Sequence, residues 1–191
     1  IFFFFFMNIA IIKYNAGNIQ SVLFALERIG VFRIVTDDEQ QIRKADKVIF
    51  PGVGEAGSAM AYLRERKLDE VIKSLQQPVL GICLGMQLLC THSEENDTVC
   101  LGIVPVNVKK FQPNAGSGSV DNQMLKVPQI GWNNIYDLRS PLFNGVAENS
   151  YMYHVHSYYA EDSAYTIAKC RYGVEYAAAV KKDNFYGVQF H

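Results

Sequence analysis

The chain has little net charge and few of the residues that build metal sites or disulfide frameworks. Its 191 residues carry a formal net charge of −1 at pH 7, which gives no electrostatic argument for binding to nucleic acid or to an anionic membrane. Four cysteines occur without any Cys-x-x-Cys pair, so the sequence predicts neither a disulfide framework nor a zinc site. Free thiols persist in reducing compartments, and we therefore expect a cytoplasmic protein.

The apolar run Ile1–Phe6 is too short for a membrane span, which needs about 20 residues. It also lacks the positively charged region and the cleavage site of a signal peptide. We expect residues 1–6 to be an artefact or an apolar extension, with Met7 as the natural start. No internal repeat or interdomain linker is evident, so residues 7–191 are expected to form one domain.

Short apolar segments alternate with amphipathic segments in the first half of the chain. Strands are predicted at residues 8–12, 32–35, 47–50 and 79–82, with helical faces near 19–29 and 60–71. This alternation is typical of an α/β fold with a central parallel sheet covered on both faces.

The second half of the chain has a different pattern, with few helical segments. Strands are predicted at residues 104–111, 129–135, 151–156, 165–171, 177–180 and 186–190. Some of these should pair as antiparallel hairpins. Residues 112–123, rich in Gly, Ser and Asn, predict a loop.

The segment Gly81-Ile82-Cys83-Leu84-Gly85-Met86-Gln87 carries the strongest functional signal. A Gly-x-nucleophile-x-Gly sequence between a strand and a helix predicts a sharp turn that lifts the nucleophile out of the sheet. A helix N-terminus favours the thiolate, so Cys83 is predicted to be a cysteine nucleophile with an acidic thiol. The other cysteines, Cys90, Cys100 and Cys170, lack such a setting and are interpreted as packing residues.

Open α/β sheets bind ligands at the carboxyl ends of their strands. Besides the Cys83 turn, two segments are expected there: Pro51-Gly52-Val53-Gly54 and Gly187-Val188-Gln189-Phe190-His191. Pro51-Gly52-Val53-Gly54 follows a strand. One of its N–H groups and that of Leu84 could form an oxyanion hole, although an ordinary Pro-Gly turn is the alternative.

A cysteine nucleophile requires a histidine as its proton acceptor and donor. His191 ends an apolar strand, where a catalytic residue would be presented. His154 and His156 are predicted to face the same side of one strand. His92 lies in a polar stretch and is interpreted as solvated.

Together these segments resemble the class I (triad) glutamine amidotransferases, and most closely the glutamine amidotransferase subunits of imidazole glycerol phosphate synthase. Three more motifs carry the resemblance: Gly131-Trp132-Asn133, Val155-His156-Ser157-Tyr158 and Lys182-Asp183-Asn184-Phe185-Tyr186-Gly187-Val188-Gln189-Phe190-His191. The resemblance covers Met7–His191. It implies a three-layer amidotransferase-like fold, with a mostly parallel central sheet and antiparallel strands in the second half.

The resemblance also implies a role for individual residues. Cys83 would attack the glutamine side-chain amide to form a thioester, and His191 would protonate the departing ammonia. Gly52, Val53 and Leu84 would supply the oxyanion hole. The implied glutamine-binding residues are Gly52, Gln87, Glu95, His156, Ser157 and Tyr158. For Glu95, a solvated surface charge is the alternative.

The implied partner is a (β/α)8-barrel cyclase, in a heterodimer. Ammonia would pass to this barrel, which makes imidazole glycerol phosphate and an aminoimidazole carboxamide ribotide in histidine biosynthesis. No metal or organic cofactor is implied. Asn15, Asn18, Trp132 and Tyr153 are the expected partner contacts. The alternatives are ordinary turn residues for the two asparagines and core positions for the two aromatics.

One departure from the family pattern concerns the triad. In the family, Pro-Glu follows the histidine and the glutamate orients the imidazole, whereas the sequence given ends at His191. We therefore expect the sequence given to be truncated. A protein that did end at His191 would be expected to have weak or no glutaminase activity.

Three other functions are compatible with parts of the sequence. A glutaminase could serve another acceptor, in pyridoxal phosphate, anthranilate or guanylate synthesis, although Met86 and Gly131-Trp132-Asn133 argue against it. A cysteine on such a turn also occurs in chaperone, peptidase or redox-sensor domains. A non-catalytic binding subunit is the last alternative.

Overall fold

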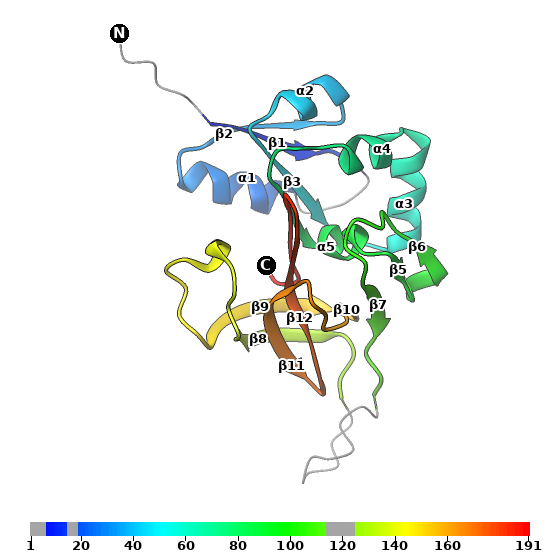
Figure 1. The fold of residues 1–191 in the computed structure, drawn as a ribbon, viewed down its shortest axis with the longest axis vertical. Coiled ribbons are helices and arrows are strands. Elements are labelled where there is room, and N and C mark those ends of the chain that lie inside the picture. The colour runs from blue at the N-terminus through cyan, green and yellow to red at the C-terminus, as the bar shows by residue number, and fades with distance from the viewer. Residues whose placement is uncertain (1–6, 15–18, 114–124) are drawn as a thin grey trace.

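A computed structural model describes residues 7–14, 19–113 and 125–191 (Figure 1). Within these residues, an 11-stranded mixed sheet has the order β2-β1-β3-β4-β13-β12-β10-β7-β5-β6, with β11 paired to β12. A separate two-stranded sheet contains β8 and β9. The α/β fold with parallel strands first and antiparallel strands later is the fold that the sequence predicts.

The first half of the chain forms the parallel part of the sheet. Its strands are β1 (Asn8–Ile12), β2 (Phe32–Thr36), β3 (Lys47–Gly52) and β4 (Val79–Cys83). Its helices are α1 (Ile19–Arg28), α2 (Glu39–Lys44), α3 (Ala56–Glu65) and α4 (Leu68–Lys73). Helix α2 was not predicted, since 6 residues are too few to show a helical period. Its N-cap residue is Asp38, whose carboxylate accepts the N–H of Gln41 at 2.8 Å.

The second half begins with α5 (Leu84–Leu89) and continues mainly as strands. These are β5 (His92–Ser93), β6 (Thr98–Val99), β7 (Asn107–Lys110), β8 (Gln129–Ile135), β9 (Ser150–His156), β10 (Tyr158–Ala160), β11 (Thr166–Tyr172), β12 (Val174–Lys182) and β13 (Phe185–Val188). Two short 3₁₀ helices, η1 (Glu95–Asp97) and η2 (Pro141–Phe143), interrupt them.

Antiparallel pairing is confirmed for β8 with β9, β11 with β12, and β12 with β13. Strand β13 then runs parallel to β4, which brings the end of the chain beside the Cys83 turn. The predicted strands 104–111 and 186–190 are too long, because only Asn107–Lys110 and Phe185–Val188 pair as strands. The short strands β5, β6 and β10 escaped prediction, since two or three residues show no period.

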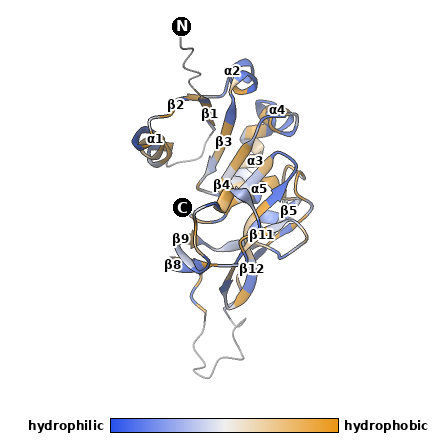
Figure 2. Ribbon diagram, turned by 60° about the vertical axis from the view of Figure 1, so that its left-hand side comes forward, coloured by the Kyte–Doolittle hydropathy of each residue, from blue (hydrophilic) through white to orange (hydrophobic). Residues whose placement is uncertain are grey.

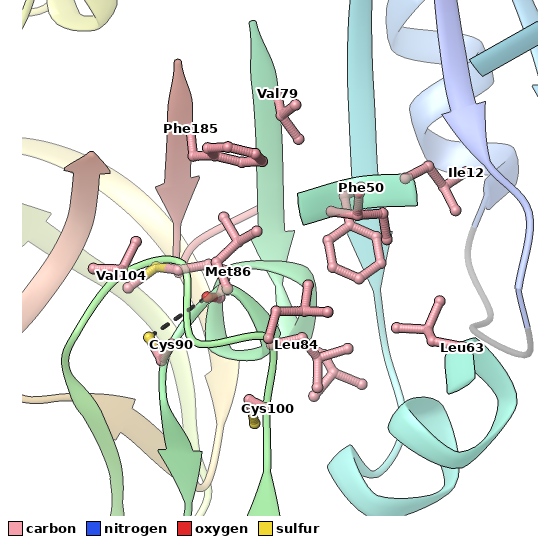
Figure 3. Packing of buried hydrophobic residues seen from close by; sticks show 14 of the residues in the cluster. Ile12, Phe50, Leu63, Val79, Leu84, Met86, Cys90, Cys100, Val104 and Phe185 are labelled. Carbon is pink, nitrogen blue, oxygen red and sulfur yellow. Dashed lines mark hydrogen bonds between the residues drawn. The ribbon is translucent and has the colours of Figure 1, made fainter. Parts of the chain in front are cut away.

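Both faces of the parallel strands are covered, as the alternation of side chains along β1 shows. Ile12 packs with Phe50 and Leu63 in the largest core cluster, which also takes in residues of α4 and α5 (Figure 3). Ile11 faces the other side and packs with Leu26 of α1. Figure 2 shows hydrophobic residues along β4 and α3 and mainly hydrophilic residues on α2. The result is a three-layer arrangement.

The second core cluster lies around Tyr176 and Phe111, in the antiparallel half of the molecule. Cys90, Cys100 and Cys170 are buried, which confirms their interpretation as packing residues. Figure 3 shows Cys90 in the core, where its thiol lies 3.7 Å from the carbonyl oxygen of Met86. In the three described ranges, no helix has both the length and the hydropathy needed to cross a membrane.

Helix α5 starts so close to β3 and β4 that its first turn has no space for side chains at several positions. A Cβ atom on Gly85 would overlap the carbonyl oxygen of Phe50, and one on Gly81 would lie 2.8 Å from the backbone nitrogen of Met86. A Cβ on Gly52 would lie 2.7 Å from the nitrogen of Gly85. These glycines therefore permit direct backbone contact between the turn and the two strands.

We expect Gly85→Ala to lower the free energy of unfolding by about 3 kcal/mol or more, because the methyl group would meet a backbone carbonyl that cannot rotate away. Urea denaturation followed by circular dichroism measures this loss. Gly102→Ala is the matched control, since Gly102 has φ +70° but open space around its Cα. Its cost should be only the ~1–2 kcal/mol of the left-handed conformation. Equal losses in the two variants would contradict the packing argument.

Candidate active site

A cavity of about 340 Å³ opens beside the Cys83 turn, at the carboxyl ends of β3 and β4. Segments far apart in the sequence form its wall, from the end of β3 to the last residue. The lining residues are Val53, Gly54, Cys83, Leu84, Gln87, Glu95, Pro128, Val155, His156, Ser157, Tyr158 and His191. The structure thus brings together every residue predicted for catalysis, the oxyanion hole and glutamine binding except Gly52. Gly52 lies next to this wall, paired in register with Cys83.

Cys83 occupies the sharp turn between β4 and α5. Its φ of 55° and ψ of −112° lie outside the conformations that a non-glycine residue favours. Such strain persists only where the surroundings impose it, and it clusters at functional sites. Here the close contacts of Gly81 and Gly85 with the neighbouring backbone hold Cys83 in this conformation. The geometry is that of a nucleophile turn.

The Cys83 thiol is not acidic, which corrects the sequence prediction. Burial raises its pKa to about 11, while the N–H of Leu84 and the side-chain amide of Gln189 lower it and the negative charge of Glu95 raises it further. The expected effect of the helix is too weak, since α5 has only 6 residues. A thiol of this kind requires a base to remove its proton when it reacts.

Tyr14 supports the loop that follows β3. Its buried hydroxyl donates a hydrogen bond of 2.6 Å to the carbonyl oxygen of Pro51, and its ring packs 5.3 Å from that of Phe50. Burial raises the pKa of Tyr14, so the hydroxyl keeps its proton and remains a donor. The Pro51–Gly52 peptide is thereby fixed beside Cys83. Nothing in the sequence distinguished Tyr14 from any other aromatic at a strand end.

Glu95 lies in η1 and reaches the cavity. One carboxylate oxygen accepts the N–H of Ala56, at the start of α3, at 2.8 Å. Burial raises the pKa of Glu95, and the hydrogen bond from Ala56 opposes this shift. The alternative interpretation of Glu95 as a solvated surface charge is therefore wrong. Its carboxylate is half-buried and available to a positively charged group in the cavity.

Two glutamine side chains connect the cavity wall to the sulfur. The Nε2 of Gln87 lies 2.9 Å from the carbonyl oxygen of Tyr158 and 2.9 Å from the Oε1 of Gln189. The Nε2 of Gln189 lies 3.6 Å from the sulfur of Cys83. Gln189 was missed as a site residue. The one signal for it was an amide side chain within an apolar segment.

His156 forms part of the cavity wall, and His154 lies behind it on the same face of β9, as predicted. The Nδ1 of His156 donates to the carbonyl oxygen of Tyr158 at 2.7 Å. Its Nε2 is 3.3 Å from the Nδ1 of His154, which also lies 3.1 Å from the hydroxyl of Tyr176. Burial lowers the pKa of His154 to about 4 and that of His156 to about 3. Both imidazoles are therefore neutral at pH 7.

His191 lies at the cavity, as predicted, but three residues beyond the end of β13, because the strand ends at Val188 and not at residue 190. Its backbone N–H donates to the carbonyl oxygen of Tyr153 at 2.9 Å. Partial burial lowers the pKa of its imidazole below the ordinary value. A neutral imidazole can accept a proton, which is the chemistry the thiol requires. His92 is only half-exposed, with its Nε2 2.8 Å from a carboxylate oxygen of Asp97.

Strands β8 and β9 present an exposed apolar face, here named the β8–β9 patch. It consists of Ile130, Trp132, Tyr151, Tyr153 and Val155, which alternate along the two paired strands. Trp132 is 70% exposed, Tyr151 68% and Ile130 63%. The Trp132 and Tyr153 rings meet edge to face, 5.7 Å apart. Val155 also lines the cavity, so the patch borders it.

The core alternative for Trp132 is wrong, because its side chain is exposed although Gly131, Trp132 and Asn133 lie within β8, which has the bounds of the predicted strand 129–135. A residue within a two-stranded sheet can be as exposed as one in a turn when nothing covers its face. Asn15 and Asn18, the other expected partner contacts, lie outside the described residues.

The comparisons with known proteins agree with this geometry. The family model "Glutamine amidotransferase class-I" matches residues 11–191. The chain is 51% identical over 185 residues to the imidazole glycerol phosphate synthase subunit HisH of Bacteroides fragilis, covering 97% of this chain and 91% of that one. The HisH subunit of Shewanella oneidensis is 45% identical over 198 residues, covering 96% of this chain and 88% of that one.

Solved structures show the same fold at low sequence identity. A glutamine amidotransferase from Thermotoga maritima superposes with a TM-score of 0.66 and 14% identity, covering 97% of this chain and 76% of that one. At this identity the similarity supports the fold alone.

The buried histidines predict an acid-dependent loss of stability. Below the ordinary histidine pKa of 6.5, the unfolded chain takes up protons that the folded chain excludes until about pH 4 at His154. The free energy of unfolding should therefore fall as the pH falls through this window, by about 2 kcal/mol per buried histidine at pH 5. His154→Phe should reduce the loss between pH 7.5 and pH 5 by about 2 kcal/mol, as measured by urea denaturation.

Tyr176→Phe is the matched control for this prediction. It removes a hydroxyl beside His154 without removing an imidazole, so it should lower stability at every pH and leave the pH dependence close to that of the wild type. If His154→Phe keeps the full wild-type pH dependence, the folded protein protonates His154 freely.

Proposed function

The chain belongs to the class I glutamine amidotransferase family, as a HisH-type subunit of imidazole glycerol phosphate synthase, and from this premise we propose how its cavity releases ammonia from glutamine. It is an enzyme subunit of histidine biosynthesis. One observation carries the proposal: a strained cysteine, a neutral histidine and a half-buried carboxylate line the same cavity. Other acceptors and the chaperone or peptidase alternatives are not favoured by relatives this similar.

In the first half of the reaction, the Cys83 thiol gives its proton to His191 as the sulfur attacks the side-chain amide carbon of glutamine. The N–H of Leu84 and an N–H of the Gly52–Val53 segment hold the resulting oxyanion. The carbon–nitrogen bond then breaks while His191 returns the proton to the leaving nitrogen. The products of this half are ammonia and a γ-glutamyl thioester on Cys83.

In the second half, His191 removes a proton from water, and the hydroxide attacks the thioester carbon. The carbon–sulfur bond breaks, glutamate leaves, and the proton on His191 returns to the sulfur. The same imidazole thus acts twice as base and twice as acid. This alternation requires a pKa near or below neutrality, and the partial burial of His191 is consistent with it.

Glutamine is held by the other residues that line the cavity. Glu95 receives its α-ammonium group, since a half-buried carboxylate is stabilised in its charged form by a neighbouring cation. Gln87, His156 and the Ser157–Tyr158 segment line the same cavity. Gly52 acts from behind the cavity wall, since a side chain there would meet the nitrogen of Gly85 and force β3 away from the Cys83 turn.

A HisH subunit works with a partner subunit, and we infer that this partner is a (β/α)8-barrel cyclase seated on the β8–β9 patch. The patch is apolar, centred on an aromatic pair, and borders the cavity through Val155. Ammonia that leaves the cavity on this side enters the barrel, which forms imidazole glycerol phosphate and an aminoimidazole carboxamide ribotide. Four free cysteines in the described part of the chain favour the cytoplasm.

We expect 6-diazo-5-oxo-L-norleucine, a glutamine analogue with an electrophilic carbon, to label Cys83, because the cavity places its reactive group at the sulfur. Peptide mass spectrometry should find the adduct on Cys83 and not on Cys90, Cys100 or Cys170, which do not line the cavity. Cys83→Ala should remove the label, and L-glutamine but not D-glutamine should slow it. Labelling that L-glutamine leaves unchanged would exclude the glutaminase function.

We expect Trp132→Ala to raise the dissociation constant for the barrel cyclase at least about 30-fold, since a central exposed Trp is the usual anchor of an interface. Isothermal titration calorimetry with the cognate barrel subunit measures the change. Phe32→Ala is the control, because Phe32 is comparably exposed, at 61%, but lies on the edge strand β2. Equal affinities for the wild type and Trp132→Ala would place the interface elsewhere.

A further inference from the structure

We propose that Gln189 is a dedicated hydrogen-bond donor to the sulfur of Cys83, which holds the sulfur in place and stabilises its thiolate. The inference rests on the proposed function in one respect, that Cys83 is the nucleophile. The register of β13 with β4 pairs Val188 with Ile82. The next residues, Gln189 and Cys83, therefore lie side by side where the two strands end, and the Nε2 of Gln189 is 3.6 Å from the sulfur.

The hydrogen-bond network fixes which end of the Gln189 amide faces the sulfur. The backbone carbonyl of Tyr158 can only accept, so the Gln87 atom 2.9 Å from it is the NH₂ group. That same NH₂ group lies 2.9 Å from Gln189, which must therefore present its oxygen to Gln87. The NH₂ group of Gln189 is left facing Cys83. The sulfur consequently receives a donor, and a flipped amide would break the bond with Gln87.

The burial of Gln189 points to a function for its amide. The residue is 0% exposed and does not line the cavity, so it contacts neither solvent nor the space for the substrate. An amide in such a position costs free energy relative to an apolar side chain unless it is fully hydrogen-bonded. Val188 and Phe190 on either side are apolar. A Met or Leu would serve for packing alone, whereas a donor to the sulfur requires the amide.

The donor acts against the main obstacle to reaction at Cys83. Burial opposes ionisation of the thiol, and the hydrogen bonds from the Leu84 N–H and the Gln189 amide favour the thiolate. An N–H group donates more strongly to a charged sulfur than to a neutral thiol. Gln189 therefore contributes most when the proton has left Cys83, which is the state that attacks.

Alkylation by iodoacetamide tests the donor directly in the full chain. The Cys83 thiolate displaces iodide from the CH₂ carbon to give a thioether, and the thiol proton goes to solvent. Below the thiol pKa, the rate constant is proportional to the thiolate fraction and rises tenfold per pH unit. Peptide mass spectrometry follows Cys83 separately from the other cysteines between pH 7 and pH 9.

Gln189→Met, similar in length but unable to donate, should lower the rate constant about tenfold at each pH, equivalent to a pKa higher by about one unit. Gln189→Glu keeps the acceptor for Gln87 and places a carboxylate beside the sulfur, so the rate constant should fall further. Gln129→Met is the matched control, because Gln129 is a second buried glutamine, bonded to Tyr176 at 3.0 Å. It should alkylate at the wild-type rate.

Rate constants within twofold of the wild type for folded Gln189→Met and Gln189→Glu would overturn the proposal. A loss in Gln129→Met as large as that in Gln189→Met would do the same, since it would show a general effect of disturbing the core. Because iodoacetamide needs neither glutamine nor a partner, this result is independent of the labelling by the glutamine analogue. The labelling experiment can therefore contradict the glutaminase function while the alkylation experiment supports Gln189 as a donor, and the opposite outcome is also possible.

Discussion

Direct backbone contact between the Cys83 turn and strand β3 is the constraint on which the rest of the site depends. At Gly85, Gly81 and Gly52, a Cβ atom would overlap or crowd neighbouring backbone atoms. Because these side chains are missing, α5 starts immediately beside β3. This approach imposes the strained dihedral angles of Cys83 and sets Gly52 level with it. Strain of this kind is maintained by the packing around it, and here that packing is the centre of the largest core.

A second organising element is the carbonyl oxygen of Tyr158. It accepts from Gln87 at 2.9 Å and from His156 at 2.7 Å. Since a carbonyl has no proton to give, it fixes the tautomer of His156 and the orientation of the Gln87 amide. The Gln87 amide then orients Gln189, and His156 leaves its unprotonated Nε2 toward His154. One backbone atom therefore determines the hydrogen-bond polarity of the whole inner wall.

Much of the fold and most of the cavity wall could be predicted from the sequence, because they depend on local patterns. Mainly apolar segments of four or five residues located the central strands, and the glycine spacing located the turn at Cys83. The resemblance then selected nearly all of the lining residues. Short elements such as α2, β5 and β10 escaped because they contain too few residues to show a period.

Properties that depend on burial in three dimensions could not be predicted. The acidity of Cys83 is one, because the cost of burying the thiolate outweighs the short helix that the sequence does show. Gln189 and Tyr14 are two others, since their importance lies in contacts with residues more than 30 positions away. Trp132 was correctly expected at the surface, but the sequence left a core position open, because the exposed face of a two-stranded sheet looks like any other strand in the sequence.

The side-by-side position of Cys83 and Gln189 also has a consequence for folding. The two residues are 106 positions apart, and Gln87 is 102 positions from Gln189. Closing a loop of that length costs chain entropy before any contact within it forms. The pairing of β13 with β4 is therefore a long-range contact, and domains rich in such contacts fold slowly. The cavity is not a local structural unit: its hydrogen bonds form together with the global fold and are lost with it.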